Sequence, residues 1–543
     1  MGLGIDALWL SPVYPSPMAD FGYDVADYRD VDPLFGSLAG LDRLIADSHA
    51  AGLRVILDWV PNHTSDRHPW FLASRSDRRS PYRDWYIWRD GAPGRAGRDG
   101  GTGGPGGPGG PGGPGGAGGA PPNNWRAAFP GVGRTEFPPA WTFDPPSGQW
   151  YLHLFLPEQP DLNWAHPEVQ EAMADTLRFW LDRGVDGFRM DVIHAIGKDP
   201  ALPDLPPDLA PIPMCALIDD PSTHPLVAGI RAVVKERRPD AVIIGETVLP
   251  TVAQVARFYG TGAAPELDLA FNFHPLHARW DAGVWRQQID QVVAEIAPAG
   301  WPAWALGNHD NPRQRTRYGS AARARAAAVL LLTQMGTPFL YAGEELGLSD
   351  AVVPADRKVD PGGRDGCRAP IPWSAVERGG SGVGGGGVGV GGVGVVGVGV
   401  GVGGELVGGW AGEPWLPWPP EAATGQDAAA QAADPESTLH LYRRLLAARR
   451  GSPALAYGRF DWVPAPAGVL AYRREGDGDE RVVGVNFSAA AADWVLPEGA
   501  WAIEVGTYSG TEEPAGVPGG PVRLRLRLRP DEAVVLRPVS VKD

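Results

Sequence analysis

Short apolar segments that each end in a polar cluster, and that helices follow, recur along most of this chain of 543 residues. Strands that alternate with helices predict a parallel β-sheet covered by helices. Repeated about seven to eight times, this unit is typical of a TIM barrel, the α/β fold in which eight parallel strands close on themselves. The expected strands span residues 5–10, 54–59, 185–190, 242–246, 267–272, 303–306 and 338–341.

Helix ends and a later change of period indicate the rest of the organisation. Pro167 begins an apolar-periodic helix that ends at Gly184, and a second clear helix runs from Ser437 to Gly451. Beyond it, apolar and polar residues alternate in 482–487 and 523–529, between Gly, Pro and Asp turns. This period of two predicts a small antiparallel β domain.

Two tracts rich in glycine interrupt this pattern. Residues 100–116 repeat Gly-Gly-Pro, and residues 379–404 alternate Gly with Val. Because glycine loses more backbone entropy on folding than any other residue, both tracts are interpreted as disordered insertions that carry no chemistry.

Composition excludes several classes of function. A net charge of −16 argues against binding to nucleic acid or to anionic membranes, which both need clustered positive charge. Cys215 and Cys367 are too few for a disulfide framework, which favours a reduced, cytoplasmic location. We expect no membrane span and no signal peptide, since no apolar run is long enough and the first residues lack a basic region.

Four expected strand ends carry charged side chains: DWVPNH (58–63), GFRMDVIH (187–194), IGETV (244–248) and GNHD (307–310). The carboxyl ends of barrel strands form the active face, so Asp191, Glu246 and Asp310 are expected to meet at one mouth of the barrel. The alternative is that each acid caps a helix, a position that Asp favours. Four clusters that mix carboxylates with His or Arg favour the functional interpretation.

Converging carboxylates are typical of glycoside hydrolases, which need one protonated and one ionised carboxyl group. Like charges at close range provide this, because they push one group toward its protonated form. Arg189 lies two residues before Asp191 and is expected to face the same side and keep Asp191 ionised. Asp191 is therefore the candidate nucleophile and Glu246 the candidate acid. His63 and His309 lack a neighbouring HExxH or CxxC motif, which disfavours a metal hydrolase.

In wording and order these motifs resemble the α-amylase family of glycoside hydrolases (family 13), most closely its α-glucosidase and oligo-1,6-glucosidase branch. The resemblance covers nearly the whole chain outside the two glycine-rich tracts. It rests on GIDALWLSPVYPSPMADFGYDVADY (4–28), DWVPNHTSD, QPDLNW (159–164), GFRMDVIH, GETV, NHDNPR (308–313), GTPFLYAGEE (336–345) and GCRAPIPW (366–373).

The resemblance implies a role for each matching residue. Asp191 would be the nucleophile, Glu246 the general acid/base, and Asp310 the carboxylate that binds sugar hydroxyls and stabilises the transition state. The other matching residues would bind one terminal glucose: His63, Arg189 and His309 by hydrogen bonds, Tyr23 by stacking, Phe155 and Gln159 by lining the pocket, and Asp20 with Arg368 by closing its far end.

The resemblance also implies a domain organisation. The barrel would comprise residues 1–61 and 165–450, an inserted domain after the third strand would comprise 62–164, and a C-terminal β-sandwich domain would comprise 451–543. Family members have a further strand and helix ahead of the GIDALWLSP text, so the barrel is expected to lack its first strand. We interpret this as a start codon assigned too late. The alternative is a damaged barrel. The usual calcium loop is absent with it, so we expect no metal and no cofactor.

The predicted function is a retaining, exo-acting α-glucosidase that acts on short oligosaccharides. Val192, which follows the nucleophile, resembles the oligo-1,6-glucosidases, but one side chain discriminates by only about 1–3 kcal/mol, so α-1,4 and α-1,6 preference stay open. A transglucosidase or a trehalose-forming isomerase would use the same site. A non-catalytic protein on the same scaffold is the alternative from another class, and the presence of all three carboxylates disfavours it. The oligomeric state stays open.

Overall fold

The structure is a computed structural model that describes residues 2–92, 119–132, 134–214, 218–375, 409–410, 412–511, 514–516 and 524–539. Both glycine-rich tracts, and Cys215, lie outside the described residues. The chain forms two compact units. The N-terminal unit comprises Asp6–Phe271 with Asp360–Gly362, and the C-terminal unit comprises Met1–Ile5, Asn272–Val359 and Gly363–Asp543.

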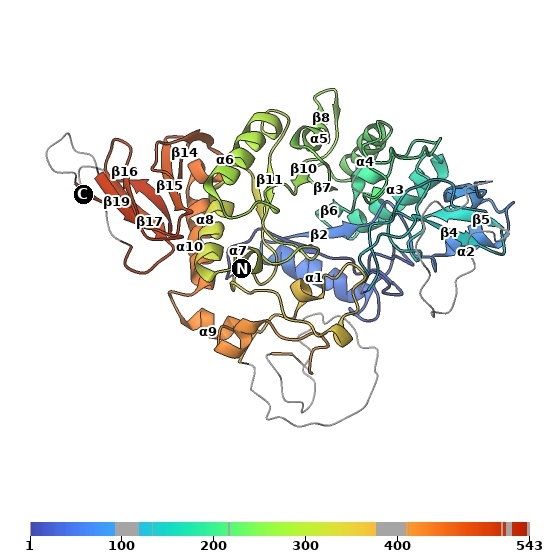
Figure 1. The fold of residues 1–543 in the computed structure, drawn as a ribbon, viewed down its shortest axis with the longest axis horizontal. Helices are drawn as coiled ribbons and strands as arrows, with labels where there is room; N and C mark the ends of the chain where they lie inside the picture. Colours follow the sequence, from blue (N-terminus) through green and yellow to red (C-terminus); the bar gives the residue numbers. More distant parts are fainter. Residues whose placement is uncertain are drawn as a thin grey trace. The chain divides into compact units, whose positions relative to one another are not determined.

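Five neighbouring strands form the parallel sheet of the N-terminal unit (Figure 1). They are β1 (Ala7–Leu10), β2 (Arg54–Trp59), β6 (Gly187–Met190), β7 (Val242–Thr247) and β10 (Leu269–Asn272). The strands β2, β6 and β7 are buried along nearly their whole length. Burial on both faces is typical of a parallel sheet that helices cover, and it explains why these strands read as continuous apolar runs.

Helices alternate with these strands, as the sequence pattern predicts. The helix α3 (Pro167–Asp182) begins at the predicted Pro167, and His166 caps it by accepting a hydrogen bond from the Glu168 backbone. Its apolar stripe, which includes Val169, Met173, Leu177 and Trp180, is buried. Further helices of this unit are α1 (Leu38–Ala50), α4 (Thr223–Arg237), α5 (Val252–Arg257) and the short helix η2 (Ile193–Ala195). A small hairpin pairs β8 (Gly260–Thr261) with β9 (Ala264–Pro265).

A small substructure lies between β2 and α3 in the sequence. It contains α2 (Pro69–Ser76), η1 (Arg83–Trp85) and an antiparallel sheet in which β5 (Gln149–Leu152) lies between β3 (Trp88–Arg89) and β4 (Trp141–Asp144). An aromatic cluster that includes Trp125, Trp141 and Trp150 fills its core. Many of the chain's 21 tryptophans are therefore core residues, the simpler of the two interpretations that their number allows.

The C-terminal unit carries two further parallel strands, β11 (Ala303–Ala305) and β12 (Thr337–Phe339). The helix α8 (Ala321–Thr333) is buried on all sides from Ala326 to Thr333, which explains its almost uniformly apolar sequence. The remaining helices are α6 (Ala282–Gln291), the π-helical turn η4 (Val292–Ile296), α7 (Gln314–Tyr318), η5 (Ala355–Arg357), η6 (Asp365–Arg368), η7 (Pro420–Thr424), α9 (Ala428–Ala433), α10 (Thr438–Gly451) and α11 (Pro453–Tyr457).

Two antiparallel sheets complete the C-terminal unit, in orange to red in Figure 1. The larger has the order β13 (Arg459–Trp462), β14 (Val469–Gly476), β15 (Asp479–Asn486), β20 (Ala533–Pro538) and β17 (Trp501–Gly506), and the smaller has β19 (Leu524–Leu528) between β16 (Ala492–Val495) and β18 (Ala515–Gly516). Side chains from both sheets, among them Val482, Trp494 and Leu526, share one apolar core. The predicted antiparallel β domain is thus present.

All seven strands expected for the barrel are found, each within two residues of its predicted bounds. In the described part of the chain they occur as β1, β2, β6, β7, β10, β11 and β12, seven strands where a complete barrel has eight. The fold class is therefore confirmed. No helix among the described residues has the length and hydropathy that a bilayer crossing requires.

Candidate active site

The register of three neighbouring strands places the key side chains. Asp58 on β2 is the direct partner of Arg189 on β6, and Met190 on β6 is the partner of Gly245 on β7. The next residues along β6 and β7 are Asp191 and Glu246. Because neighbouring strands lie about 4.8 Å apart, this register places the two acids side by side at the carboxyl ends of their strands.

Close packing beneath Glu246 requires a residue without a side chain. A Cβ at Gly245 would come within 2.3 Å of Leu267 Cδ1 and 2.9 Å of Ile193 Cγ2. Contacts that short are sterically forbidden, so a larger residue would displace either these two buried side chains or the strand end that carries Glu246. The glycine of the GETV motif is thus explained by the packing of β7.

One buried guanidinium binds three carboxylates. Arg189 Nη1 donates to Asp58 Oδ1 at 2.9 Å and to Asp191 Oδ1 at 2.7 Å, while its Nη2 lies 2.6 Å from Glu246 Oε2. The side chain of Arg189 is only 2 % exposed. Asp191 and Glu246 therefore share a single cation and lie on either side of it.

The charge balance of this cluster differs from the expectation that Arg189 keeps Asp191 ionised. Burial raises the pKa of Asp191 well above its usual range, and although Arg189 opposes the shift, Glu246 and Asp58 add to it. Burial likewise raises the pKa of Asp58 to about 6, against the opposing effect of Arg189. One positive charge is too little for three buried carboxylates, so the cluster favours a state that holds a proton.

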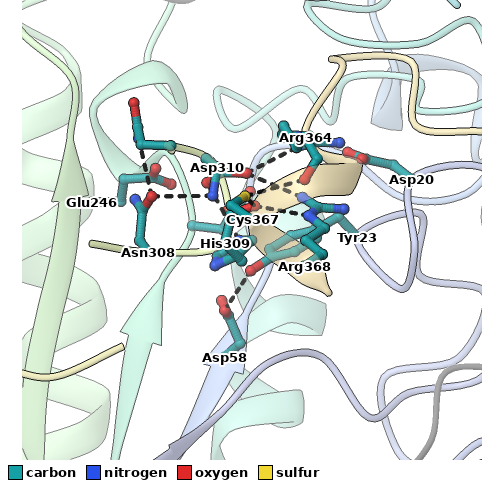
Figure 2. A network of polar contacts seen from close by, with 12 residues as sticks. Asp20, Tyr23, Asp58, Glu246, Asn308, His309, Asp310, Arg364, Cys367 and Arg368 are labelled. Atoms are coloured by element: carbon teal, nitrogen blue, oxygen red, sulfur yellow. Dashed lines mark hydrogen bonds and ion pairs between the residues drawn. The ribbon is translucent and has the colours of Figure 1, made fainter. Parts of the chain in front are cut away.

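Asp58 is a site residue that sequence reasoning missed. Its Oδ2 accepts a hydrogen bond from Tyr23 Oη at 2.9 Å (Figure 2). The same oxygen accepts from Trp9 Nε1 at 3.3 Å, in addition to the bonds of Asp58 with Arg189. Asp58 is the first residue of the strand-end cluster DWVPNH, but no role in the site was predicted for it. Its pairing with Arg189 across two strands could have indicated it.

Five of the predicted glucose-binding residues gather in the N-terminal unit. Gln159 Nε2 donates to Asp20 Oδ2 at 3.0 Å and lies 3.0 Å from His63 Nε2, and the ring of Phe155 lies 5.1 Å from that of His63. The backbone N–H of Tyr23 donates to the Asp20 carbonyl at 3.1 Å. Burial, with a smaller effect from Lys198, lowers the pKa of His63 to about 3, so its imidazole is neutral and suited to hydrogen bonds with hydroxyl groups.

A buried lysine lies behind this group. Lys198 Nζ lies 3.0 Å from Asp161 Oδ2 and donates to Asn62 Oδ1 at 2.9 Å and to the Ala195 carbonyl at 2.8 Å. The lysine connects η2 with the segments before and after the small inserted sheet. Among the described residues, no group of three or more His, Cys, Asp or Glu side chains is arranged to hold a metal ion.

A second cluster lies within the C-terminal unit, after β11. Asp310 Oδ1 accepts from Arg364 Nη1 at 2.9 Å and from Arg368 Nη2 at 3.2 Å, and its Oδ2 lies 3.3 Å from His309 Nε2 (Figure 2). Asn308 Oδ1 accepts from the Asp310 backbone N–H at 3.0 Å and so fixes this turn. The predicted Asp310, His309 and Arg368 are thus together, and Arg364 is an additional partner that lay outside any recognised motif.

The profile of the family described as "Alpha amylase, catalytic domain" matches residues 1–384. The chain is 36% identical to a probable alpha-glucosidase of Rhizobium meliloti (strain 1021), over 91% of this chain and 84% of that protein. It is 31% identical to an oligo-1,6-glucosidase of Parageobacillus thermoglucosidasius, over 91% and 85%.

The structure resembles that of a solved enzyme over almost its full length. The crystal structure of the trehalulose synthase MutB from Pseudomonas mesoacidophila MX-45 matches with a TM-score of 0.79 and 32% identity. The match covers 99% of this chain and 92% of that one. Sucrose is described as a substrate of MutB.

Proposed function

The chain belongs to the α-amylase family of glycoside hydrolases, and we propose that it is an exo-acting α-glucosidase that removes terminal α-linked glucose from short oligosaccharides with retention of configuration. The observation that carries this proposal is the pairing of Asp191 with Glu246 on neighbouring strands around Arg189. Retaining glycosidases use two carboxyl groups about 5–5.5 Å apart, a separation similar to the roughly 4.8 Å between neighbouring strands.

The proposed reaction has two steps. Asp191 attacks the anomeric carbon while Glu246 protonates the oxygen of the leaving sugar, which forms a covalent glucosyl-enzyme. Water then enters, Glu246 takes its proton, and the glucosyl ester is hydrolysed. The first step needs one protonated and one ionised carboxyl group. The geometry supports a joint action of the two groups, because Arg189 contacts both, Asp191 Oδ1 at 2.7 Å and Glu246 Oε2 at 2.6 Å.

The binding roles follow the family resemblance. His63 and Arg189 would hydrogen-bond the glucose or the nucleophile, Tyr23 would stack on the ring, and Asp20, Phe155 and Gln159 would shape the pocket. Asp310, His309 and Arg368 keep their proposed roles in binding sugar hydroxyls and closing the pocket. The two arginines on Asp310 Oδ1 support its role, because their hydrogen bonds hold this carboxyl group in one orientation.

Transfer of glucose to a second sugar is the alternative. The similarity to a trehalulose synthase favours it, since that enzyme has a closely similar fold at 32% identity. The same glucosyl-enzyme would then react with a sugar hydroxyl in place of water, and the outcome depends on how well the site excludes water.

Incubation with maltose, isomaltose and sucrose, followed by identification of the products, separates these functions. We expect glucose as the main new product and, by proton NMR at early times, the α anomer first. An early β anomer would contradict retention, and new disaccharides in place of free glucose would favour the transfer reaction.

Substitution of the nucleophile tests the site directly. We expect Asp191→Ala to lose essentially all turnover while circular dichroism shows an unchanged fold. Asp175→Ala is a suitable control, because Asp175 is half exposed on α3 and serves only ion pairs there. Retained turnover in Asp191→Ala would contradict the assignment.

We also propose a cytoplasmic location. The support is the use of cysteine, since two cysteines in 543 residues are not the pattern of an oxidising compartment, and Cys367 is a buried free thiol. Fractionation of the native cells, with activity measured in each fraction, tests this.

A further inference from the structure

The residue after the proposed nucleophile has an unusual backbone conformation. Val192 is left-handed, with φ 35° and ψ 42°, and immediately precedes η2. This region is sterically unfavourable for residues with a Cβ, and most of all for a β-branched one. Val192 is also buried, with 7% of its surface exposed. A buried, strained residue next to a reactive group indicates that the surrounding structure holds it there for a reason.

The left-handed turn aims the peptide N–H of Val192 at the proposed acid/base. This N–H donates to Glu246 Oε2 at 3.0 Å. The same Oε2 lies 2.6 Å from Arg189 Nη2. Among the described residues, no hydrogen-bond donor contacts Glu246 Oε1. The two oxygens of this carboxyl group are therefore held in different environments.

We propose that the Val192 peptide N–H is a positioning group for the general acid/base, and that with Arg189 it fixes Glu246 Oε2 as an acceptor so that Oε1 carries the catalytic proton. This inference rests on the proposed function and adds to it the atom that donates and the group that orients it. The backbone, rather than the valine side chain, supplies the effect.

The proton balance of the first step shows what the bond contributes. The proton on Oε1 moves to the glycosidic oxygen, which keeps the electron pair of the breaking C1–O bond, while Asp191 forms the new bond to C1. Glu246 becomes a carboxylate, and its Oε2 gains negative charge. Hydrogen bonds to a charged acceptor are about twice as strong as those between neutral groups, so the Val192 bond strengthens as the proton leaves.

A purely structural role predicts something different. The Val192 carbonyl accepts a hydrogen bond from the Ala195 N–H at 2.8 Å, so the turn also helps to form η2. If forming η2 were the only role of this turn, removing the Val192 N–H would lower kcat/KM equally for all substrates and leave its pH dependence unchanged.

Replacement of Val192 by its α-hydroxy acid converts the amide to an ester and deletes the N–H while keeping the side chain. The matched control is the same replacement at Ala195, which deletes the ordinary bond to the Val192 carbonyl. Two substrates are compared: phenyl α-glucoside, whose leaving group needs a proton, and α-glucosyl fluoride, whose leaving group needs little help.

For the ester at Val192 we expect kcat/KM on phenyl α-glucoside to fall about tenfold to a hundredfold, the range for one hydrogen bond to a charged group. The value on α-glucosyl fluoride should change little. The alkaline limb of the pH profile should move to higher pH, because the ionised form of the acid loses a donor. The Ala195 ester and Val192→Gly both keep the peptide N–H of residue 192. In these variants the ratio of kcat/KM between the two substrates and the position of the alkaline limb should stay as in the wild type.

Equal losses on both substrates, an unmoved alkaline limb, or the same selective loss in the Ala195 ester would overturn the proposal. A measurement that does not need the ester is the pH titration of the Val192 amide proton by NMR. Its chemical shift should move downfield along the alkaline limb and stay constant in Glu246→Gln. If wild-type protein hydrolysed neither substrate, the proposed function itself would fail, and this outcome is distinct from all the others.

Discussion

At the scale of single residues, the site is governed by a shortage of positive charge. Arg189 binds Asp58, Asp191 and Glu246, and all three carboxylates are almost fully buried. Burial disfavours ionised groups, so the arrangement costs folding free energy at neutral pH. Active sites commonly carry such a cost, because the same strained electrostatics serve the reaction.

Asp191→Asn should therefore be more stable than the wild type at pH 7, by about 0.5–2 kcal/mol. The pKa of Asp191 is raised in the folded state, so this carboxyl supports folding fully only below its unfolded value of about 3.9 and loses that contribution as pH rises through its folded pKa. Urea unfolding between pH 4 and pH 8 measures the effect.

The stability difference between Asp191→Asn and the wild type should shrink as the pH falls toward 4. Asp175→Asn on the exposed face of α3 should stay within about 0.5 kcal/mol of the wild type throughout. A variant at Asp191 that is less stable than the wild type at pH 7 would refute the electrostatic interpretation.

At the scale of elements, short connections between strands and helices hold the active face together. Lys198 exemplifies this, because it lies just after η2 yet reaches Asp161 before α3 and Asn62 after β2. The lysine side chain is 4% exposed and the aspartate is fully buried. Breaking a buried ion pair leaves an uncompensated charge, which is far more costly than losing a surface pair.

Lys198→Met should lower the free energy of unfolding by about 3–5 kcal/mol. The control is Lys235→Met, which should cost about 1 kcal/mol or less, because Lys235 is partly exposed and its partner Asp268 keeps an ion pair with Arg231. Both values come from urea unfolding at pH 7.

A double variant, Lys198→Met with Asp161→Asn, separates the charge effect from packing. Removing the Asp161 carboxylate, which Lys198→Met leaves without its cation, should recover part of the lost free energy of unfolding. If Lys198→Met alone is no less stable than Lys235→Met, the ion pair does not connect these segments energetically.

At the scale of the whole molecule, the C-terminal β domain is part of a compact unit with barrel elements. Thr333 at the end of α8 illustrates this: its Oγ1 is 2.5 Å from Tyr472 Oη on β14, and its carbonyl accepts from Arg474 Nη1 at 2.5 Å. Since α8 is apolar on all sides from Ala326 to Leu332, this part of the helix needs cover on all sides. The larger sheet thus helps to bury a barrel helix.

A chain that ends at Gly458 should consequently fail to fold its C-terminal unit. We expect a loss of most of the soluble yield and, in the soluble remainder, strong binding of the dye ANS to exposed apolar surface. Arg459→Ala, at an exposed position on β13, is the control and should keep the yield. A truncated chain that stays soluble and unfolds cooperatively would show that the barrel elements are stable alone.

The sequence by itself determined the features of the fold that are local in the chain or that repeat along it. Apolar runs located the seven strands, and Pro167 and Ser437 located two helix starts. The order of motifs predicted Asp191, Glu246 and Asp310 as the catalytic carboxylates. These features depend on neighbours in the chain or on strand ends, so a linear pattern records them. The expected convergence of carboxylates at strand ends also holds for Asp191 and Glu246.

Only the tertiary structure decided how charge is distributed among these groups. Strand register places Asp58 beside Arg189, and a loop distant in sequence brings Arg364 to Asp310. Val192 contributes through a left-handed backbone conformation that its residue type does not predict. The reversal at Asp191, whose pKa rises despite Arg189, comes from burial. Burial, register and backbone torsion are properties of three-dimensional packing, and spacing along a chain does not encode them one residue at a time.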